Sequence, residues 1–170
     1  MNNLLTQKMR YYFQLLRWNK PSGRLILLIP AGWSLWLTPT APPSLLVLGL
    51  IIVGGLLVSG AGCIANDIWD SQLDKKVTRT KERPLANGKV SLRNAWILLI
   101  LLLFLSLFTV LSIPSDSRKL CFQLASLSLP FILLYPSAKR WFKYPQLFLS
   151  LCWGFSVLIP WAASESSLRG

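Results

Sequence analysis

The sequence predicts an all-helical protein that crosses a membrane several times. Of its 170 residues, 53% are hydrophobic and only 14% are charged, and the mean hydropathy is +0.49. The charged residues gather between long apolar runs, which is the pattern of a polytopic membrane protein. The sequence has no histidine and its three cysteines form no CxxC pair, so it excludes a Ser-His-Asp triad, histidine-ligated zinc and thiolate redox sites.

An amphipathic helix is expected at the N-terminus, followed by five spans. Over residues 4–18, apolar side chains recur at helical spacing among basic ones, which suits a helix lying in the membrane interface. A bilayer crossing needs about 20 mainly apolar residues. Prolines 39, 114 and 136 indicate turns between spans. The candidate spans are 21–37, 45–68, 92–113, 120–135 and 145–163.

The basic residues are distributed unevenly between alternate connecting segments. The N-terminal segment and the loops after the second and fourth spans carry 15 of the 18 Lys and Arg residues. The positive-inside rule therefore predicts a cytoplasmic N-terminus and a cytoplasmic loop after the second span. The net charge of +12 then reflects this topology and contact with anionic lipid, and nucleic acid is not an expected partner.

Three of the six acidic residues lie close together at the cytoplasmic end of the second span. Asn66, Asp70 and Asp74 are spaced four residues apart, so on a helix they would form a stripe about 12 Å long, with Asp67 beside it. Stacked carboxylates repel one another, so this spacing indicates a cationic partner. Carboxylate and amide oxygens suit Mg²⁺, which usually also binds phosphate oxygens. The pattern predicts a metal site formed by Asn66, Asp70 and Asp74.

Basic residues surround this acidic stripe in the predicted topology. The loop expected over 69–91 carries Arg79 and Arg83, and two more basic segments, around Arg17 and around Lys139, are expected on the same side of the membrane. Acids next to fixed bases suggest a polyanion that is held by metal on one side and by Lys and Arg on the other. The alternative interpretation is a solvated positive-inside loop whose acids have no function.

The sequence carries a series of short motifs: Asn66-Asp67-x-x-Asp70-x-x-x-Asp74, Arg79-Thr80, Arg83-Pro84-Leu85-x-x-Gly88, Tyr135-Pro136-x-x-Lys139-Arg140, Pro145-Gln146 and, upstream, Lys20-Pro21-x-Gly23. Together these motifs resemble one enzyme family. The combination covers essentially the whole chain and is similar to that of the UbiA-type intramembrane aromatic prenyltransferases, most of all those that use 4-hydroxybenzoate, including the cyanobacterial plastoquinone type. The resemblance implies a helical bundle of eight or nine spans, of which residues 1–170 would be the N-terminal part of a single domain.

The resemblance also implies a reaction and a role for each residue. A polyprenyl diphosphate would bind through Mg²⁺, with Asp70 and Asp74 as catalytic residues and Asn66 as a further metal ligand. The diphosphate would leave, and a small aromatic acceptor would attack the allylic cation, in ubiquinone or plastoquinone biosynthesis. The expected location is the bacterial inner (plasma) membrane or the thylakoid. The substrate-binding residues would be Asn66, Asp67, Arg79, Arg83, Tyr135, Lys139 and Arg17.

Two features depart from the family pattern. Position 59 is serine, whereas many family members that use 4-hydroxybenzoate have arginine at the matching place to meet the acceptor's carboxylate. Arg17 or Arg24 could replace it, and homogentisate or a chlorin is the alternative acceptor. The family's second aspartate-rich motif is missing, so we expect these 170 residues to be inactive or nearly so. A non-catalytic protein that binds prenyl diphosphates, and a small transporter or structural membrane protein, are the remaining alternatives.

Overall fold

The computed structural model describes residues 2–20 and 22–169, apart from the side chains of residues 2–5 and 139. Within these ranges the chain is helical and contains no strand, which confirms the predicted all-helical fold. The helices are α1 (Asn2–Leu15), α2 (Ser22–Trp36), α3 (Leu45–Asp74), α4 (Leu92–Leu111), α5 (Ser115–Trp141) and α6 (Gln146–Glu165).

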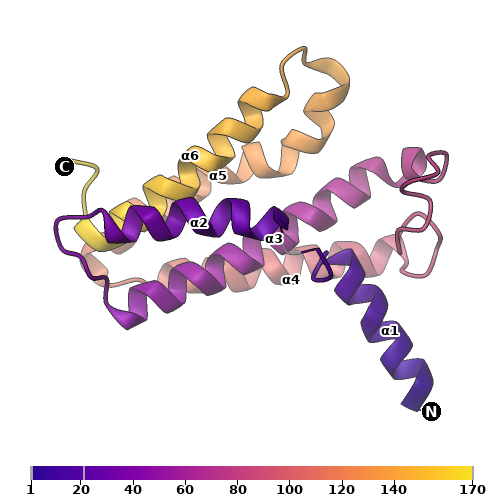
Figure 1. The fold of residues 1–170 in the computed structure, drawn as a ribbon, viewed down its shortest axis with the longest axis horizontal. Coiled ribbons are helices and arrows are strands. Elements are labelled where there is room, and N and C mark those ends of the chain that lie inside the picture. Colours follow the sequence, from indigo (N-terminus) through magenta and orange to yellow (C-terminus); the bar gives the residue numbers. More distant parts are fainter. Residues whose placement is uncertain (1, 21, 170) are drawn as a thin grey trace.

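Two helical hairpins and a linking helix make up the bundle (Figure 1). α3 packs antiparallel against α4, and α5 packs antiparallel against α6. α2 contacts both α6 and α3, so it joins the two hairpins, and α3 also contacts α5. α1 projects away from the bundle and packs with its C-terminal part against α3 and α4. As a result, the C-terminal end of α3 lies near the end of α1, the loop that follows α3 and the end of α5.

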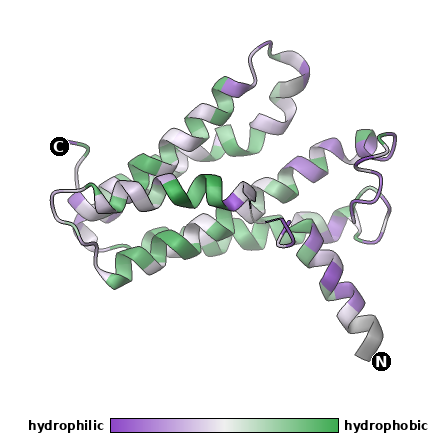
Figure 2. Cartoon of the chain, in the orientation of Figure 1, coloured by the Kyte–Doolittle hydropathy of each residue, from purple (hydrophilic) through white to green (hydrophobic). Residues whose placement is uncertain are grey.

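Four helices in the described part of the chain are long and apolar enough to cross a membrane: α3, α4, α6 and the Ser115–Ala138 part of α5. Hydrophobic residues dominate these helices, whereas α1 and the loop after α3 are largely hydrophilic (Figure 2). The first expected span, 21–37, corresponds to α2, whose 15 residues are fewer than the roughly 20 that a crossing needs. By length and hydropathy, four helices in the described ranges therefore qualify as spans, and α2, which packs along α3 and α6 in the place of the first expected span, falls short of this length.

The acidic stripe lies within a helix rather than at the start of a loop. α3 has 30 residues and begins at its N-cap Ser44, whose side chain accepts a hydrogen bond from the Val47 backbone N–H. It continues to Asp74, so the segment expected as a loop over 69–91 is helical up to that residue. The helix fixes the relative positions of Asn66, Asp70 and Asp74.

α5 is longer than expected because it passes through a proline. The sequence predicts a turn at Pro136, but this residue is buried inside α5, which continues to Trp141. Proline is tolerated in membrane helices where neighbouring groups satisfy the backbone that it frees. Pro114, in contrast, is the N-cap residue of α5, which agrees with the turn predicted there. The extra residues of α5 carry the basic segment around residue 139 toward the end of α3.

Two hydrophobic clusters hold the elements in place. One cluster joins α1, α3 and α4 and includes Leu15, Ile64 and Leu99. The loop after α3 contributes Leu85 and Val90 to the same cluster, so this loop is anchored by apolar side chains although most of its surface is polar. The other cluster joins the C-terminal end of α2 to the start of α3, to α5 and to α6. The first cluster is the one that positions the acidic residues and their partners.

Candidate functional site

Asp67 connects three segments of the chain. Its side chain is buried on α3, and its Oδ1 accepts hydrogen bonds from Arg17 Nη2 at 2.9 Å and from Arg83 Nη1 at 3.1 Å. A buried carboxylate is costly unless it is paired and hydrogen-bonded. The two guanidinium groups supply this compensation, one from the segment after α1 and one from the loop after α3. Asp67 therefore fixes both segments against α3.

Arg83 also binds a second carboxylate on the same helix. Its Nη1 lies 2.8 Å from Asp74 Oδ2, and Thr80 Oγ1 donates to the Asp74 backbone carbonyl at 3.3 Å. Asp67 and Asp74 are seven residues apart, which is close to two helical turns, so they lie on one face of α3. The loop folds back along this face and places one guanidinium between the two carboxylates.

Asp70 faces α5 instead of this loop. Arg140 Nη2 lies 3.0 Å from Asp70 Oδ1 and 2.6 Å from the Trp69 backbone carbonyl. In return, Trp69 Nε1 donates to the Leu133 carbonyl of α5 at 3.0 Å. The ends of α3 and α5 are thus held together by polar contacts in both directions. Asp70 and Arg140 keep partial exposure, so this pair is open to exchange with a ligand.

Arg17 occupies a strained position at the end of α1. The Trp18 N–H donates to the Phe13 carbonyl and the Arg17 N–H to the Gln14 carbonyl, which is the Schellman pattern of a helix C-terminus. Arg17 has φ 54°, the left-handed conformation that usually belongs to glycine at this position. Burial disfavours its charged form, but the Asp67 carboxylate outweighs this effect and the pKa of Arg17 lies above its usual value. Arg17 therefore stays cationic at any physiological pH.

An apolar cavity of about 780 Å³ extends along α3 from this cluster. Its walls come from α2, α3, α4, α5 and α6, and its lining residues on α3 run from Leu50 to Asn66. Arg17, Asn66 and Tyr135 line the end nearest the acids, and Ile113 and Pro160 line the other. The cavity thus offers a charged end and a long apolar body, which suits a molecule with an anionic head and a hydrocarbon tail.

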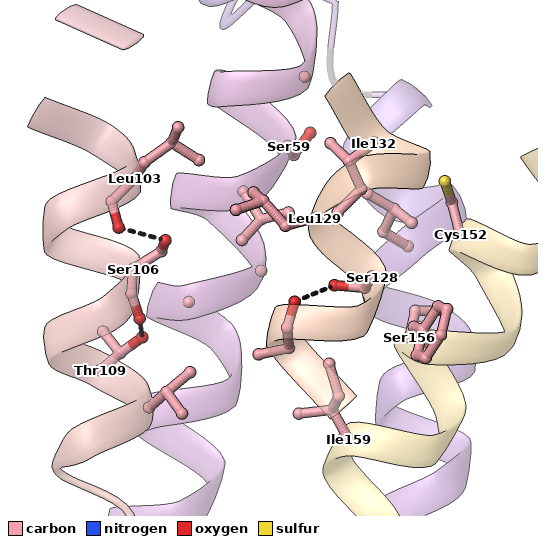
Figure 3. Close-up of a pocket in the computed structure, with 18 of the residues that line it drawn as sticks. Ser59, Leu103, Ser106, Thr109, Ser128, Leu129, Ile132, Cys152, Ser156 and Ile159 are labelled. Atoms are coloured by element: carbon pink, nitrogen blue, oxygen red, sulfur yellow. Dashed lines mark hydrogen bonds between the residues drawn. The ribbon is translucent and has the colours of Figure 1, made fainter. Parts of the chain in front are cut away.

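Four of the hydroxyl groups in the cavity wall are already hydrogen-bonded to their own helices. Ser106, Thr109 and Ser128 donate to carbonyls of their own helices at 2.8, 2.7 and 2.8 Å (Figure 3). Ser156 does the same on α6. These hydroxyls therefore add little polarity to the body of the cavity, which remains suited to hydrocarbon.

The structure brings together five of the residues that the sequence proposed: Arg17, Asp67, Asp70, Asp74 and Arg83 all take part in ion pairs. Two more, Asn66 and Tyr135, line the adjoining cavity. Arg79 is exposed on the loop and forms no ion pair with a described residue. The side chain of Lys139 lies outside the described part of the structure.

Arg140 was not selected from the sequence, although it stands in the same basic motif as Lys139. The sequence distinguishes Arg140 only as the neighbour of Lys139. Two neighbouring cations on a helix point in directions about 100° apart, and only the packing of the helices decides which one meets α3. Arg24 forms no ion pair with a described carboxylate, but it lies against the end of α1 through a hydrogen bond to the Leu16 carbonyl.

The donor chemistry of the cluster fits magnesium shared with a phosphate ligand. Asn66, Asp70 and Asp74 supply amide and carboxylate oxygens, which Mg²⁺ prefers. No group of three or more Cys, Asp or Glu side chains among the described residues is arranged to hold a metal ion by itself. Mg²⁺ commonly takes only one or two carboxylates and fills its shell with water and substrate phosphate, so these residues fit it in that form.

The structure is thus a bundle of apolar helices with an acid–arginine cluster at one end of an apolar cavity, an arrangement that suits an amphiphilic anion. The chain belongs to the UbiA prenyltransferase family, whose match covers residues 27–169. This confirms the family that the motifs indicated.

Curated relatives are named for prenyl transfer to 4-hydroxybenzoate. The 4-hydroxybenzoate solanesyltransferase of Synechocystis sp. is 45% identical over 154 residues, which cover 91% of this chain and 51% of the relative. The 4-hydroxybenzoate octaprenyltransferase of Legionella pneumophila (strain Lens) is 41% identical over 158 residues, which cover 93% of this chain and 55% of the relative. The chain spans about half the length of these relatives.

Solved structures share the fold. A UbiA homologue from Archaeoglobus fulgidus, bound to GPP and Mg²⁺, matches with a TM-score of 0.75 at 21% identity, covering 94% of this chain and 56% of that one. The apo structure of a UbiA homologue from Aeropyrum pernix K1 matches with a TM-score of 0.68 at 26% identity, covering 95% and 52%. The arrangement of α1 to α6 is therefore that of a UbiA-type membrane protein.

Proposed function

We propose that the protein transfers a polyprenyl group from a polyprenyl diphosphate to 4-hydroxybenzoate in quinone biosynthesis, and that this chain supplies its diphosphate-binding part. The observation that carries the proposal is the arrangement of Asp67, Asp70 and Asp74 at the end of α3, each facing an arginine from another segment, beside an apolar cavity. The names of the relatives support the acceptor, and the ligands of the archaeal homologue support a prenyl diphosphate with magnesium.

In this proposal the residues of the cluster, together with Mg²⁺, neutralise the negative charge of the diphosphate. Asn66, Asp70 and Asp74 would hold Mg²⁺, which neutralises charge on the diphosphate when bound. Arg83 and Arg140 stabilise the additional negative charge that the leaving diphosphate gains as its allylic C–O bond breaks. The partly exposed pair of Asp70 and Arg140 can separate at the lowest cost, which frees the carboxylate for metal and the guanidinium for phosphate.

The cavity would then protect the reactive intermediate. Its apolar walls hold the polyprenyl tail and exclude water from the allylic cation. A carbon of the electron-rich acceptor ring forms the new C–C bond and loses its proton to restore aromaticity. Tyr135, which lines the charged end of the cavity, contacts the diphosphate in this proposal, as do Lys139 and Arg79 on the basis of the family motif.

We also propose that these 170 residues bind the prenyl diphosphate without efficient turnover. The relatives are about twice as long as the stretch that this chain matches, and the second aspartate-rich motif that the resemblance implies lies further along the family sequence than these 170 residues. The N-terminus and the loop after α3 are proposed to face the cytoplasm, in a bacterial plasma membrane or a thylakoid, because 15 of the 18 basic residues fall in segments of that side.

The test is a titration of the purified chain in lipid nanodiscs with geranyl diphosphate, with and without Mg²⁺. We expect Mg²⁺-dependent binding that EDTA abolishes, and at least tenfold weaker binding in Asp70→Asn and Asp74→Asn, since charge-assisted contacts of this kind contribute about 1.5–3 kcal/mol each. Asp116→Asn is the matched control, because Asp116 is an exposed acid at the far end of α5. An affinity for geranyl diphosphate that does not depend on Mg²⁺, or that is unchanged in both variants, would overturn the proposed site.

A product assay separates the enzyme from a non-catalytic binding protein. Membranes that contain the full-length protein are incubated with 4-hydroxybenzoate, a polyprenyl diphosphate and Mg²⁺, and the prenylated product is measured by mass spectrometry. Product from the full-length protein, and little from the 170-residue chain, is the expected result. Tight binding without product in either form would favour the binding protein, and efficient turnover by the 170-residue chain would contradict its proposed inactivity.

A further inference from the structure

Arg140 is held against Asp70 by more than the ion pair between them. Its Nη2 donates to Asp70 Oδ1 at 3.0 Å and to the Trp69 carbonyl at 2.6 Å, so both acceptors lie on α3. Trp69 Nε1 donates in turn to the Leu133 carbonyl of α5 at 3.0 Å. Because these contacts fix the end of α5 against the end of α3, the guanidinium has a defined position beside the Asp70 carboxylate.

The other two carboxylates of the cluster are paired in the same way. Arg83 Nη1 lies 3.1 Å from Asp67 Oδ1 and 2.8 Å from Asp74 Oδ2, and Arg17 approaches Asp67 from the end of α1. All three carboxylates thus have a guanidinium within hydrogen-bond distance. A cation that binds one of them must displace an arginine, and breaking such a pair leaves a charged group without its partner, which is unfavourable in a partly buried cluster.

The pair of Asp70 and Arg140 is the one that a ligand can open most easily. The Asp70 side chain is 19% exposed, against 3% for Asp67 and 10% for Asp74. Arg83 bridges the two more buried acids, so displacing it would disturb both of them. Asp70 is therefore the carboxylate at which an incoming ligand first exchanges with an arginine.

A metal ion and a phosphate group together can open this pair without leaving a charge unpaired. A metal ion alone would take the Asp70 carboxylate and leave the Arg140 guanidinium next to a second cation. A phosphate alone would take Arg140 and leave the carboxylate next to a second anion. When both bind, each side chain exchanges one partner of opposite charge for another. Because linkage is reciprocal, each ligand then strengthens the binding of the other by the same factor, about 5- to 150-fold in typical cases.

We propose that Arg140 makes the site selective for a divalent metal ion that is bound together with a phosphate ligand, because it keeps the ion alone away from Asp70. This inference rests on the proposed function and gives Arg140 a second role at the same site. Besides binding the diphosphate, the guanidinium competes with the free ion for the Asp70 carboxylate. The substitution Arg140→Gln should therefore have two opposite effects. It weakens the diphosphate, which loses a contact, and it strengthens the metal ion added alone, which loses a competitor.

The test measures Mn²⁺ binding, since Mn²⁺ shares the preference of Mg²⁺ for oxygen ligands. The 170-residue chain in nanodiscs of zwitterionic lipid is dialysed to equilibrium against Mn²⁺, with and without geranyl diphosphate, and the value for empty nanodiscs is subtracted. We expect the wild-type chain to bind Mn²⁺ at least tenfold more weakly alone than with geranyl diphosphate. Arg140→Gln should bind Mn²⁺ alone at least fivefold more tightly than the wild-type chain, because neither the ion pair nor the repulsion between guanidinium and ion remains.

Two further variants show whether the effect acts through Asp70. The double variant Arg140→Gln with Asp70→Asn should lose the gain in Mn²⁺ affinity, because the carboxylate that the arginine covered is gone. Lys143→Gln is the matched control: it removes the same charge just beyond the end of α5, and Lys143 takes part in none of the four ion pairs found among the described residues. Its Mn²⁺ affinities should stay within twofold of the wild-type values. Circular dichroism of each variant establishes that the helices are intact.

Each of four results would overturn this role of Arg140. The Mn²⁺ affinity of Arg140→Gln could be unchanged or weaker, or Lys143→Gln could gain as much, which would be an effect of net charge. The double variant could keep the gain, which would place the ion away from Asp70. The wild-type chain could bind Mn²⁺ equally well with and without geranyl diphosphate. Mg²⁺-dependent binding of geranyl diphosphate is measured alongside: if it is intact, only the Arg140 inference fails, whereas its absence in the wild-type chain refutes the proposed function itself.

Discussion

The guanidinium of Arg140 lies 3.0 Å from the carboxylate of Asp70, although 70 residues separate them in the sequence. This contact joins the end of α5 to the end of α3 across the charged end of the cavity. Asp70 is 19% exposed and Arg140 is 43% exposed, so water competes for both groups. An ion pair of this kind contributes little to stability, about 1 kcal/mol or less, and its position at the site suggests a role in ligand binding.

The first prediction is that Arg140→Gln weakens ligand binding far more than it weakens the fold. We expect the Kd for geranyl diphosphate with Mg²⁺ to rise about tenfold, because a charge-assisted hydrogen bond to phosphate is lost. The free energy of unfolding should fall by less than about 1 kcal/mol. Titration calorimetry and thermal unfolding in the same nanodiscs give both values.

Lys143→Gln is the control for this substitution. Lys143 lies just beyond the end of α5 and its Nζ is 5.5 Å from the centre of the Tyr144 ring. Its removal changes the net charge by the same amount without touching an acid of the cluster. If both substitutions weaken binding equally, the effect of Arg140 is one of net charge, and its specific contact with the substrate is refuted.

The second prediction concerns Asp67, whose ion pairs hold two other segments against α3. Asp67→Asn removes the charge that pairs with Arg17 and Arg83, and it should lower the free energy of unfolding by about 2 kcal/mol. The loss stays moderate because Arg17 and Arg83 are 36% and 27% exposed and Arg83 keeps Asp74. Asp116→Asn, an exposed acid, should leave the unfolding midpoint unchanged; an equal drop in both variants would contradict the prediction.

The sequence could predict the helices and much of the acid cluster because both depend on local pattern. Apolar runs of sufficient length indicate membrane helices, and the helical period alone places Asp67 and Asp74 on one face of a helix. Arg83 follows Asp74 closely along the chain, so the ion pair between them joins residues that are near each other in sequence.

Contacts that depend on helix rotation or on the path of a loop could not be predicted. Lys139 and Arg140 are adjacent, and the packing of α5 beyond Pro136 decides that Arg140 meets Asp70. Arg79 lies in the same basic stretch of the loop as Arg83, but the turns of the loop leave Arg79 exposed. The left-handed backbone conformation of Arg17 could not be predicted either, because glycine is the usual residue at that position of a helix end.

The third prediction separates the backbone of Arg17 from its charge. Arg17→Ala and Arg17→Gly both remove the pair with Asp67, so both should weaken geranyl diphosphate binding alike. Glycine adopts φ 54° without strain, whereas alanine does not, so Arg17→Gly should be more stable than Arg17→Ala by about 1 kcal/mol. Chemical unfolding of the two variants measures this difference. Equal stabilities would mean that the cap conformation is not retained once the arginine is gone.

The fourth prediction tests whether the cavity holds the hydrocarbon tail. Ser128 is buried in its wall, and Ser128→Phe places an aromatic ring in the space that a long tail would occupy (Figure 3). Each buried methylene contributes about 0.8 kcal/mol, so displacing two of them should weaken a long prenyl diphosphate about tenfold. Dimethylallyl diphosphate, which is too short to reach this point of the cavity, should bind almost as before.

Leu127→Phe is the matched control for the cavity, because Leu127 is the preceding residue of α5 and is 58% exposed on the outer face of the helix. A ring added there enlarges the surface that faces lipid and leaves the cavity unchanged, so the ratio of the two affinities should not move. The decisive quantity is this ratio of long-chain to short-chain affinity, since a general loss of folding lowers both affinities together. A ratio that stays constant in Ser128→Phe would place the tail outside the cavity, along the lipid-facing surface of the bundle.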